Sequence, residues 1–169
     1  MNLSFKSKLF YGGGDLALNL MWQLQVFYIM FFYTDVFGLS PASAGLVFGI
    51  AKIWDAFSDP IMGYLADNTV TRWGKFRPYI LFGSFPALIA IILCFMSPDL
   101  SQTGKFYWAL FTYISFTTLY TVVAIPLGSM IPVMTEDLNE RTALSTYRYF
   151  GASLGAIVVV GCTRPIADQ

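Results

Sequence analysis

Five long stretches of mostly apolar residues run along this chain, separated by short connections rich in Pro, Ser, Gly and charge. A helix needs about 20 predominantly apolar residues to cross a bilayer. The stretches lie at roughly 11–33, 43–66, 78–96, 106–130 and 144–162. The first is too long for a signal-peptide core and carries Asp15 near its start. The pattern predicts an all-α integral membrane protein with about five spans and no β-strand.

The composition supports this class and narrows the possible chemistry. Hydrophobic residues make up 56% of the 169 positions and charged residues only 12%, about half the charged share of a typical soluble domain. The ten basic and ten acidic residues cancel, so no net field favours a nucleic acid. The chain has no histidine, which excludes His-ligated zinc and Ser-His-Asp catalysis. We therefore expect a lipid bilayer as partner, no nucleic acid, no cofactor and no enzymatic activity.

The two cysteines and the basic residues refine the picture. Cys94 and Cys162 lie in unrelated apolar runs, so they indicate neither a disulfide framework nor a metal motif. Basic residues gather on one side of the predicted spans, at Lys6, Lys8, Arg72, Lys75, Arg77 and Arg141. The opposite side has Lys105 alone. Because cytoplasmic connections carry the excess of Lys and Arg, this pattern predicts a cytoplasmic amino terminus.

Three charged residues lie on one face of the second predicted span. Lys52, Asp55 and Asp59 are spaced i, i+3 and i+7, and each charge at a helix centre costs about 2.5–3.5 kcal/mol to insert. A structural Lys52–Asp55 ion pair accounts for two of them but not for Asp59. Two carboxylates one turn apart repel each other unless a cation or a proton lies between them. The alternative is therefore a hard-cation site or a protonatable pair, with Ser58 and the backbone freed by Pro60 as further oxygen ligands.

Two further spans carry polar stripes. The stripes consist of Asp15, Asn19, Trp22 and Gln23 in the first span, and of Thr117, Tyr120, Thr121, Ala124 and Gly128 in the fourth. Hydroxyls and amides beside aromatic rings suit a sugar, whose edges form hydrogen bonds and whose faces stack. The alternative is polar contact between packed helices, which is frequent in membranes. Stripes on separate helices favour a shared polar cavity for a small molecule.

The glycines have two interpretations. Gly151 and Gly155 form a G-x-x-x-G pattern, and Gly12 begins a triple-glycine run, so both segments permit close helix packing. The run followed by Asp15 also matches the G-x-G-D of intramembrane aspartyl proteases. Those enzymes need a second aspartate that shares a proton with the first, in a Tyr-Asp on a preceding helix. The chain contains no Tyr-Asp, which makes a protease a remote alternative.

Several motifs resemble a known transporter family. They are Tyr11-Gly12, FYTDVFGL at 32–39, WDAFSDPIMG at 54–63, RWGKFRP at 72–78, Thr121 to Pro126, and Arg141 through Tyr147-Arg148. Together and in this order they resemble the glycoside–pentoside–hexuronide:cation symporters, the melibiose-carrier group of the major facilitator superfamily. The resemblance covers the whole chain, and the D-x-x-x-D-P and R-W-G-K-F-R-P motifs are its most specific parts.

The resemblance implies roles for individual residues. The cation site corresponds to Asp55, Asp59, Ser58 and Thr121, for Na⁺, Li⁺ or H⁺ as coupling ion, with no other metal expected. The sugar site corresponds to Asn19, Ala124 and Arg148, to which the polar stripes add Asp15, Trp22 and Tyr120. Asp67, Lys75 and Arg77 match a cytoplasmic gating loop. Melibiose carriers have aspartates at the positions of Asn19 and Ala124 and a tryptophan at that of Gly128, so melibiose itself is not the expected substrate.

The resemblance also implies an architecture and a mechanism. Members are multi-pass inner-membrane proteins of about twelve helices in two six-helix bundles, so residues 1–169 are expected to be part of the amino-terminal bundle, with the carboxy-terminal bundle absent. The implied activity is cation-coupled sugar, glycoside or uronide symport by alternating access. Hexuronides stay open beside neutral glycosides, which Asp15 and Trp22 slightly favour. The alternative is a truncated, transport-inactive fragment or a half that needs a partner.

Overall fold

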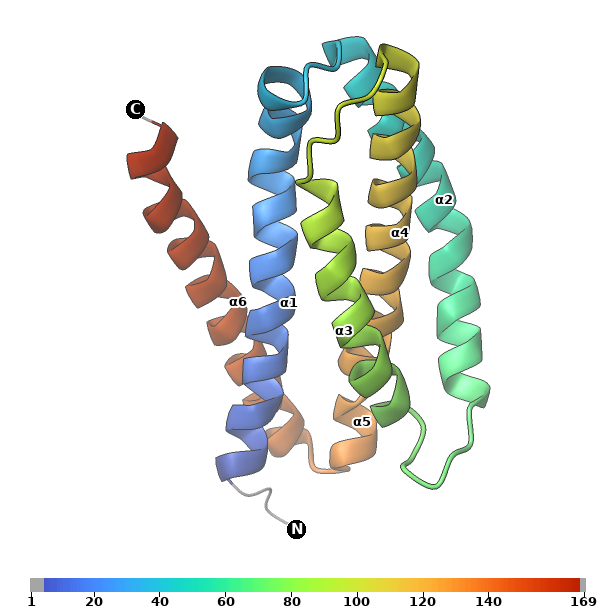
Figure 1. The fold of residues 1–169 in the computed structure, drawn as a ribbon. Helices are drawn as coiled ribbons and strands as arrows, with labels where there is room; N and C mark the ends of the chain where they lie inside the picture. Colours follow the sequence, from blue (N-terminus) through green and yellow to red (C-terminus); the bar gives the residue numbers. More distant parts are fainter. Residues whose placement is uncertain (1–4, 168–169) are drawn as a thin grey trace. The chain divides into compact units, whose positions relative to one another are not determined.

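The computed structural model describes residues 5–167, and these residues are almost entirely helical, without a strand (Figure 1). The elements, in chain order, are α1 (Phe5–Phe31), the π-helical η1 (Phe32–Val36), α2 (Pro41–Asn68), α3 (Arg77–Cys94), α4 (Gln102–Ser129), α5 (Ile131–Met134) and α6 (Leu138–Ala167). The ends of the predicted bundle, 1–4 and 168–169, and the side chain of Cys162 lie outside the described residues.

Each of the five predicted spans overlaps one long helix: 11–33 runs from α1 into η1, and 78–96 and 106–130 extend one or two residues past the ends of α3 and α4. Three segments, Lys6–Val36, Arg77–Cys94 and Gln102–Ser129, are long and apolar enough to cross a membrane. The other two spans fall in α2 and α6, of 28 and 30 residues, which carry more charge. The all-α class is therefore confirmed, whereas the exact bounds of five spans in a bilayer stay a prediction.

The connection expected before the last span is shorter than predicted. The predicted spans 106–130 and 144–162 leave a connection of polar residues between them, but α6 already begins at Leu138. The side-chain Oδ1 of Asp137 accepts a hydrogen bond from the backbone N–H of Asn139 at 2.8 Å. Asp is a favoured residue at this capping position because its side chain satisfies a free N–H of the first turn. The cap extends the helix into a segment that charge content alone assigned to a loop.

The chain divides into two compact units. The first consists of Met1–Leu24 with Leu127–Gln169, and the second of Gln25–Pro126. Helices α1 and α4 each contribute residues to both units.

In the first unit, glycines bring the start of α1 against α6. A Cβ atom on Gly151 would lie 2.7 Å from the carbonyl oxygen of Gly12, and one on Gly12 would lie 3.1 Å from that of Tyr147. A Cβ on Gly155 would lie 3.4 Å from the Cβ of Asn19. The close packing predicted for the G-x-x-x-G pattern is therefore confirmed, and the partner of α6 is α1. The Tyr11 hydroxyl adds a hydrogen bond to the Leu127 carbonyl at 2.9 Å.

The second unit packs α2, α3 and α4 alongside the end of α1 and η1 (Figure 1). Its interior contains a chain of aromatic rings, with Tyr33 stacked on Phe48 and Phe48 tilted against Tyr113 at centroid distances of 6.1 and 5.0 Å. Small residues give close contact elsewhere, since a Cβ on Gly83 of α3 would lie 2.9 Å from Val123 of α4. Ser40 caps the start of α2, where its Oγ accepts a hydrogen bond from the Ser43 N–H at 3.1 Å.

A lysine on α4 holds the turn that follows η1. Lys105 Nζ donates to the Phe37 carbonyl at 2.8 Å and lies 5.3 Å from the centre of the Phe37 ring. Gln102 Nε2 donates to the next carbonyl, that of Gly38, at 3.3 Å. Gly38 has a φ of 74°, a conformation that suits glycine. The first connection is thus tied to α4 by the single basic residue on its side of the predicted spans.

We expect Lys105→Met to lower the stability of the folded protein by about 1.5–3 kcal/mol, the usual range for a hydrogen bond that involves a charged group. Methionine keeps the apolar stem but removes the donor and the cation–π contact. The effect is measured as the change in melting temperature, with thermal unfolding monitored by size-exclusion chromatography. The exposed Lys6 is the matched control, and Lys6→Met should leave the melting temperature unchanged; equal shifts in both variants would contradict the assignment.

Candidate functional site

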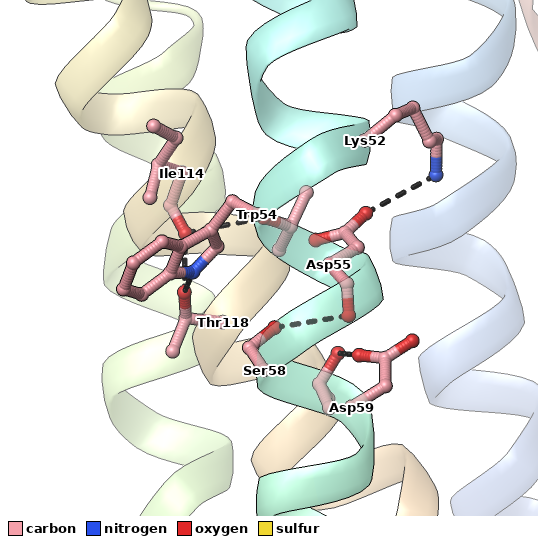
Figure 2. Close-up of polar contacts among 9 residues, drawn as sticks. Lys52, Trp54, Asp55, Ser58, Asp59, Ile114 and Thr118 are labelled. Atoms are coloured by element: carbon pink, nitrogen blue, oxygen red, sulfur yellow. Dashed lines mark hydrogen bonds and ion pairs between the residues drawn. The ribbon is translucent and has the colours of Figure 1, made fainter.

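The acidic face of α2 is the centre of the predicted cation site. Lys52, Asp55 and Asp59 extend along one side of the helix in successive turns, as Figure 2 shows. Lys52 Nζ lies 3.2 Å from Asp55 Oδ2, so the predicted ion pair is present. The lysine side chain is 61% exposed and the aspartate side chain 15%. The Lys52–Asp55 ion pair therefore involves only one carboxylate oxygen of Asp55, the more buried of the two residues.

The other oxygen of Asp55 has an unusual environment. Asp55 Oδ1 is buried and has no hydrogen-bond partner among residues 5–167. Nearly all buried polar atoms in proteins are hydrogen-bonded, and a buried charged acceptor without a donor is destabilising. A cation or a proton bound at this oxygen would remove that penalty.

Asp59 extends the site toward α4. Thr121 Oγ1 donates to Asp59 Oδ1 at 2.9 Å, with Thr121 buried and Asp59 exposed. Ser58 Oγ lies 3.5 Å from the Asp55 carbonyl oxygen, a long contact within α2. The structure thus brings Thr121 to Asp59, while Ser58 contacts its own helix.

A contact that the sequence pattern did not reveal fixes α2 to α4. The indole Nε1 of Trp54 donates to Thr118 Oγ1 at 2.8 Å, and Thr118 in turn donates to the Ile114 carbonyl (Figure 2). Trp54 precedes Asp55 directly, and Thr118 lies one turn before Thr121. The Trp54–Thr118 and Thr121–Asp59 hydrogen bonds therefore join α2 and α4 at the candidate site. The sequence offered one signal for the first of them, a tryptophan N–H donor directly before the acid Asp55.

In the first unit, Asp15, Asn19 and Arg148 form a polar network. Arg148 Nε donates to Asp15 Oδ1 at 2.7 Å, and Asn19 Nδ2 donates to Asp15 Oδ2 at 3.0 Å. Gly128 lies beside this network, because a Cβ atom there would be 3.4 Å from Arg148 Nη1. Three of the residues predicted for the substrate site are thus in contact, and the ion pair between Asp15 and Arg148 was not foreseen.

The other residues of the predicted substrate site, Trp22, Tyr120 and Ala124, lie at other positions of α1 and α4. Trp22 lies in the first unit, two turns of α1 after Asp15, whereas Tyr120 and Ala124 lie on α4 within the second unit, next to Thr121 in sequence. The Tyr120 ring is tilted against Phe116 at 5.8 Å. The three residues are partly exposed.

The predicted gating residues surround the connection between α2 and α3. Lys75 Nζ lies 3.8 Å from Asp67 Oδ1, with both side chains exposed, and Arg77 begins α3. Thr71 Oγ1 accepts from the Trp73 N–H at 3.2 Å and donates to the Gly74 carbonyl at 2.6 Å. The connection is therefore an ordered turn, whose single ion pair is weak because it is solvated.

Acidic residues alone do not form a metal centre. No group of three or more His, Cys, Asp or Glu in the described part of the chain could hold a metal ion. A monovalent cation at Asp55 and Asp59 would need neutral oxygens, such as that of Thr121, to complete its shell. Hard cations accept such mixed sets of carboxylate, hydroxyl and carbonyl oxygens.

A family model and several relatives match this chain. The model of the MFS/sugar transport protein family matches residues 10–167. YagG of Escherichia coli, a candidate glycoside/cation symporter, is 43% identical over 98% of this chain and 36% of its own length. The isoprimeverose transporter of Lactiplantibacillus pentosus is 44% identical over 92% of the chain and 33% of its own length. A glucuronide carrier protein homolog of E. coli is 37% identical over 90% of this chain and 34% of its own length. The chain thus spans about a third of the length of these relatives.

Proposed function

Because the chain belongs to the MFS/sugar transport protein family of the major facilitator superfamily, whose members are transporters and not enzymes, we propose that it takes part in cation-coupled symport of a sugar or glycoside. The relatives named as a glycoside/cation symporter and an isoprimeverose transporter support the substrate class. Alternating access at a site near the middle of the membrane is the mechanism of such folds.

The single observation that carries the coupling proposal is the buried Oδ1 of Asp55, which has no hydrogen-bond partner in the described part of the chain and shares its helix face with a second acid, Asp59. Asp55 and Asp59 supply the charge of the cation site, and Thr121 supplies a neutral oxygen from α4. Ser58 is a further candidate ligand if its hydroxyl rotates from the Asp55 carbonyl. The coupling ion is Na⁺, Li⁺ or H⁺, because oxygen ligands of this kind accept all three.

We propose substrate contacts in each unit, taken separately. In the first unit, Asp15, Asn19, Trp22 and Arg148 offer the amide, charges and ring that sugars contact. In the second unit, Tyr120 offers a ring and a hydroxyl, and Ala124 lies one turn further along α4. Cation binding and sugar binding then strengthen each other reciprocally, since linkage works equally in both directions.

The orientation and the gate follow from charge. We place the amino terminus, and the turn with Lys75, Arg77 and Asp67, on the cytoplasmic side of an inner membrane, because basic residues concentrate there. The Lys75–Asp67 pair would form and break as the transporter opens and closes, which its exposure and its length of 3.8 Å permit.

The direct test is uptake of a panel of labelled glycosides into vesicles, with and without imposed Na⁺ and pH gradients. The sample is the full-length product of the gene that encodes this chain, with the 169-residue chain alone as a second sample. Accumulation that needs a gradient supports symport, and equal uptake without any gradient would contradict it. Uptake by the first sample only would identify the chain as a part that requires a partner.

Thr121 gives a finer test of the cation site. We expect Thr121→Val to raise the cation concentration for half-maximal uptake about tenfold, the effect of losing one polar ligand of about 1.4 kcal/mol. Valine has nearly the same shape but no oxygen. Thr121→Ser restores the hydroxyl and should stay close to the unmodified protein; identical cation dependence in the valine variant would remove Thr121 from the site.

A further inference from the structure

The ion pair between Asp15 and Arg148 is exposed on one side only. The Arg148 side chain is 38% exposed, whereas that of Asp15 is 5% exposed. Arg148 is therefore the member of the pair that a small molecule can reach, whereas the Asp15 carboxylate is covered.

Both oxygens of the Asp15 carboxylate already accept hydrogen bonds. Oδ1 accepts from Arg148 Nε at 2.7 Å and Oδ2 from Asn19 Nδ2 at 3.0 Å. The bond to Asp15 uses the Nε edge of the guanidinium. Asp15 is thus held as a fixed counter-charge by neighbours on α1 and α6.

The remaining edge of the guanidinium faces a glycine. A Cβ atom on Gly128 would lie 3.4 Å from Arg148 Nη1 and 3.8 Å from Nη2. A Cβ at this position would be in van der Waals contact with both nitrogens. Glycine adds no side chain of its own there, so the Nη N–H groups have the Tyr11 hydroxyl as a neighbour and keep the fork geometry that oxygen acceptors fit.

We propose that Asp15 is a specificity-determining residue that makes this subsite select uncharged glycosides over hexuronides, an inference that rests on the proposed sugar transport. The ion pair has no net charge, so the hydroxyl oxygens of a neutral sugar accept hydrogen bonds from Arg148 without adding charge. A sugar carboxylate that binds Arg148 is attracted by the guanidinium but repelled by Asp15, whose Oδ1 lies 2.7 Å from Arg148 Nε. Repulsion of this kind discriminates by penalising the wrong ligand.

The experiment compares inhibition of labelled substrate uptake by methyl xyloside and by methyl glucuronide. In the unmodified full-length protein, methyl xyloside should inhibit more strongly. Asp15→Asn keeps an oxygen for Arg148 but removes the counter-charge, so the relative affinity for methyl glucuronide should rise at least about tenfold. Asp15→Glu keeps the charge and is the matched control, which should retain the neutral preference.

A purely structural role for Asp15 would change protein yield or both affinities together, but not their ratio. An unchanged ratio in Asp15→Asn would overturn the proposal. If that variant does not fold, the unmodified protein still decides: stronger inhibition by methyl glucuronide than by methyl xyloside, lost in Arg148→Gln, would overturn it as well. Failure of the unmodified protein to bind any sugar would overturn the proposed function itself, whereas a glucuronide preference overturns only this inference.

Discussion

Asp59→Asn is expected to reduce cation-driven accumulation of substrate to background while leaving sugar binding measurable. Asparagine keeps the oxygen that accepts from Thr121 Oγ1 at 2.9 Å, so the contact between α2 and α4 survives. The variant loses only the negative charge. Because the affinity of oxygen sites for hard cations depends on the number of charged ligands, cation affinity should fall at least about tenfold.

The measurement combines gradient-driven uptake with direct sugar binding to the purified full-length protein. Asp99 on the exposed connection between α3 and α4 is the matched acidic control, and Asp99→Asn should transport normally. Normal gradient-driven uptake by Asp59→Asn would remove Asp59 from the cation site. A pair of carboxylates that only held helices together would instead lower the yield of folded protein without uncoupling transport.

Gly151→Ala should destabilise the protein by about 3 kcal/mol, the upper part of the range for overpacking. The added Cβ would lie 2.7 Å from the Gly12 carbonyl oxygen, and a backbone atom inside a helix cannot rotate away as a side chain can. The start of α1 must therefore shift from α6, which also disturbs the Asp15–Arg148 pair between these helices.

Gly13→Ala provides the matched control, because a Cβ at Gly13 meets nothing within 4 Å. Alanine there should be neutral or stabilising by up to about 1 kcal/mol through helix propensity. The check is the melting temperature of both variants in the same detergent, together with the yield of monodisperse protein. Equal stability of the two would show that α1 and α6 are not in close contact.

The membrane class and the helices were predictable because their signals are local. Runs such as 78–96 and 106–130 bury apolar surface in lipid regardless of the rest of the fold, and α3 and α4 appear there. The start of α6 was harder to predict, because in the sequence the capping residue Asp137 looks like any charged residue of a loop. The spacing of Lys52 and Asp55 predicted their ion pair, because residues three apart on a helix are neighbours.

Contacts between distant segments were decided by the tertiary structure alone. Helical periodicity places Asp15 and Asn19 on one face, but it does not state which helix that face meets, and only the fold brings Arg148, 133 positions away, to Asp15. The hydrogen bond from Trp54 to Thr118 depends in the same way on how α2 packs against α4. The sequence by itself determined which residues are too polar to face lipid; the packing of the helices determined which of them are paired and which atoms, like Asp55 Oδ1, have no hydrogen-bond partner within residues 5–167.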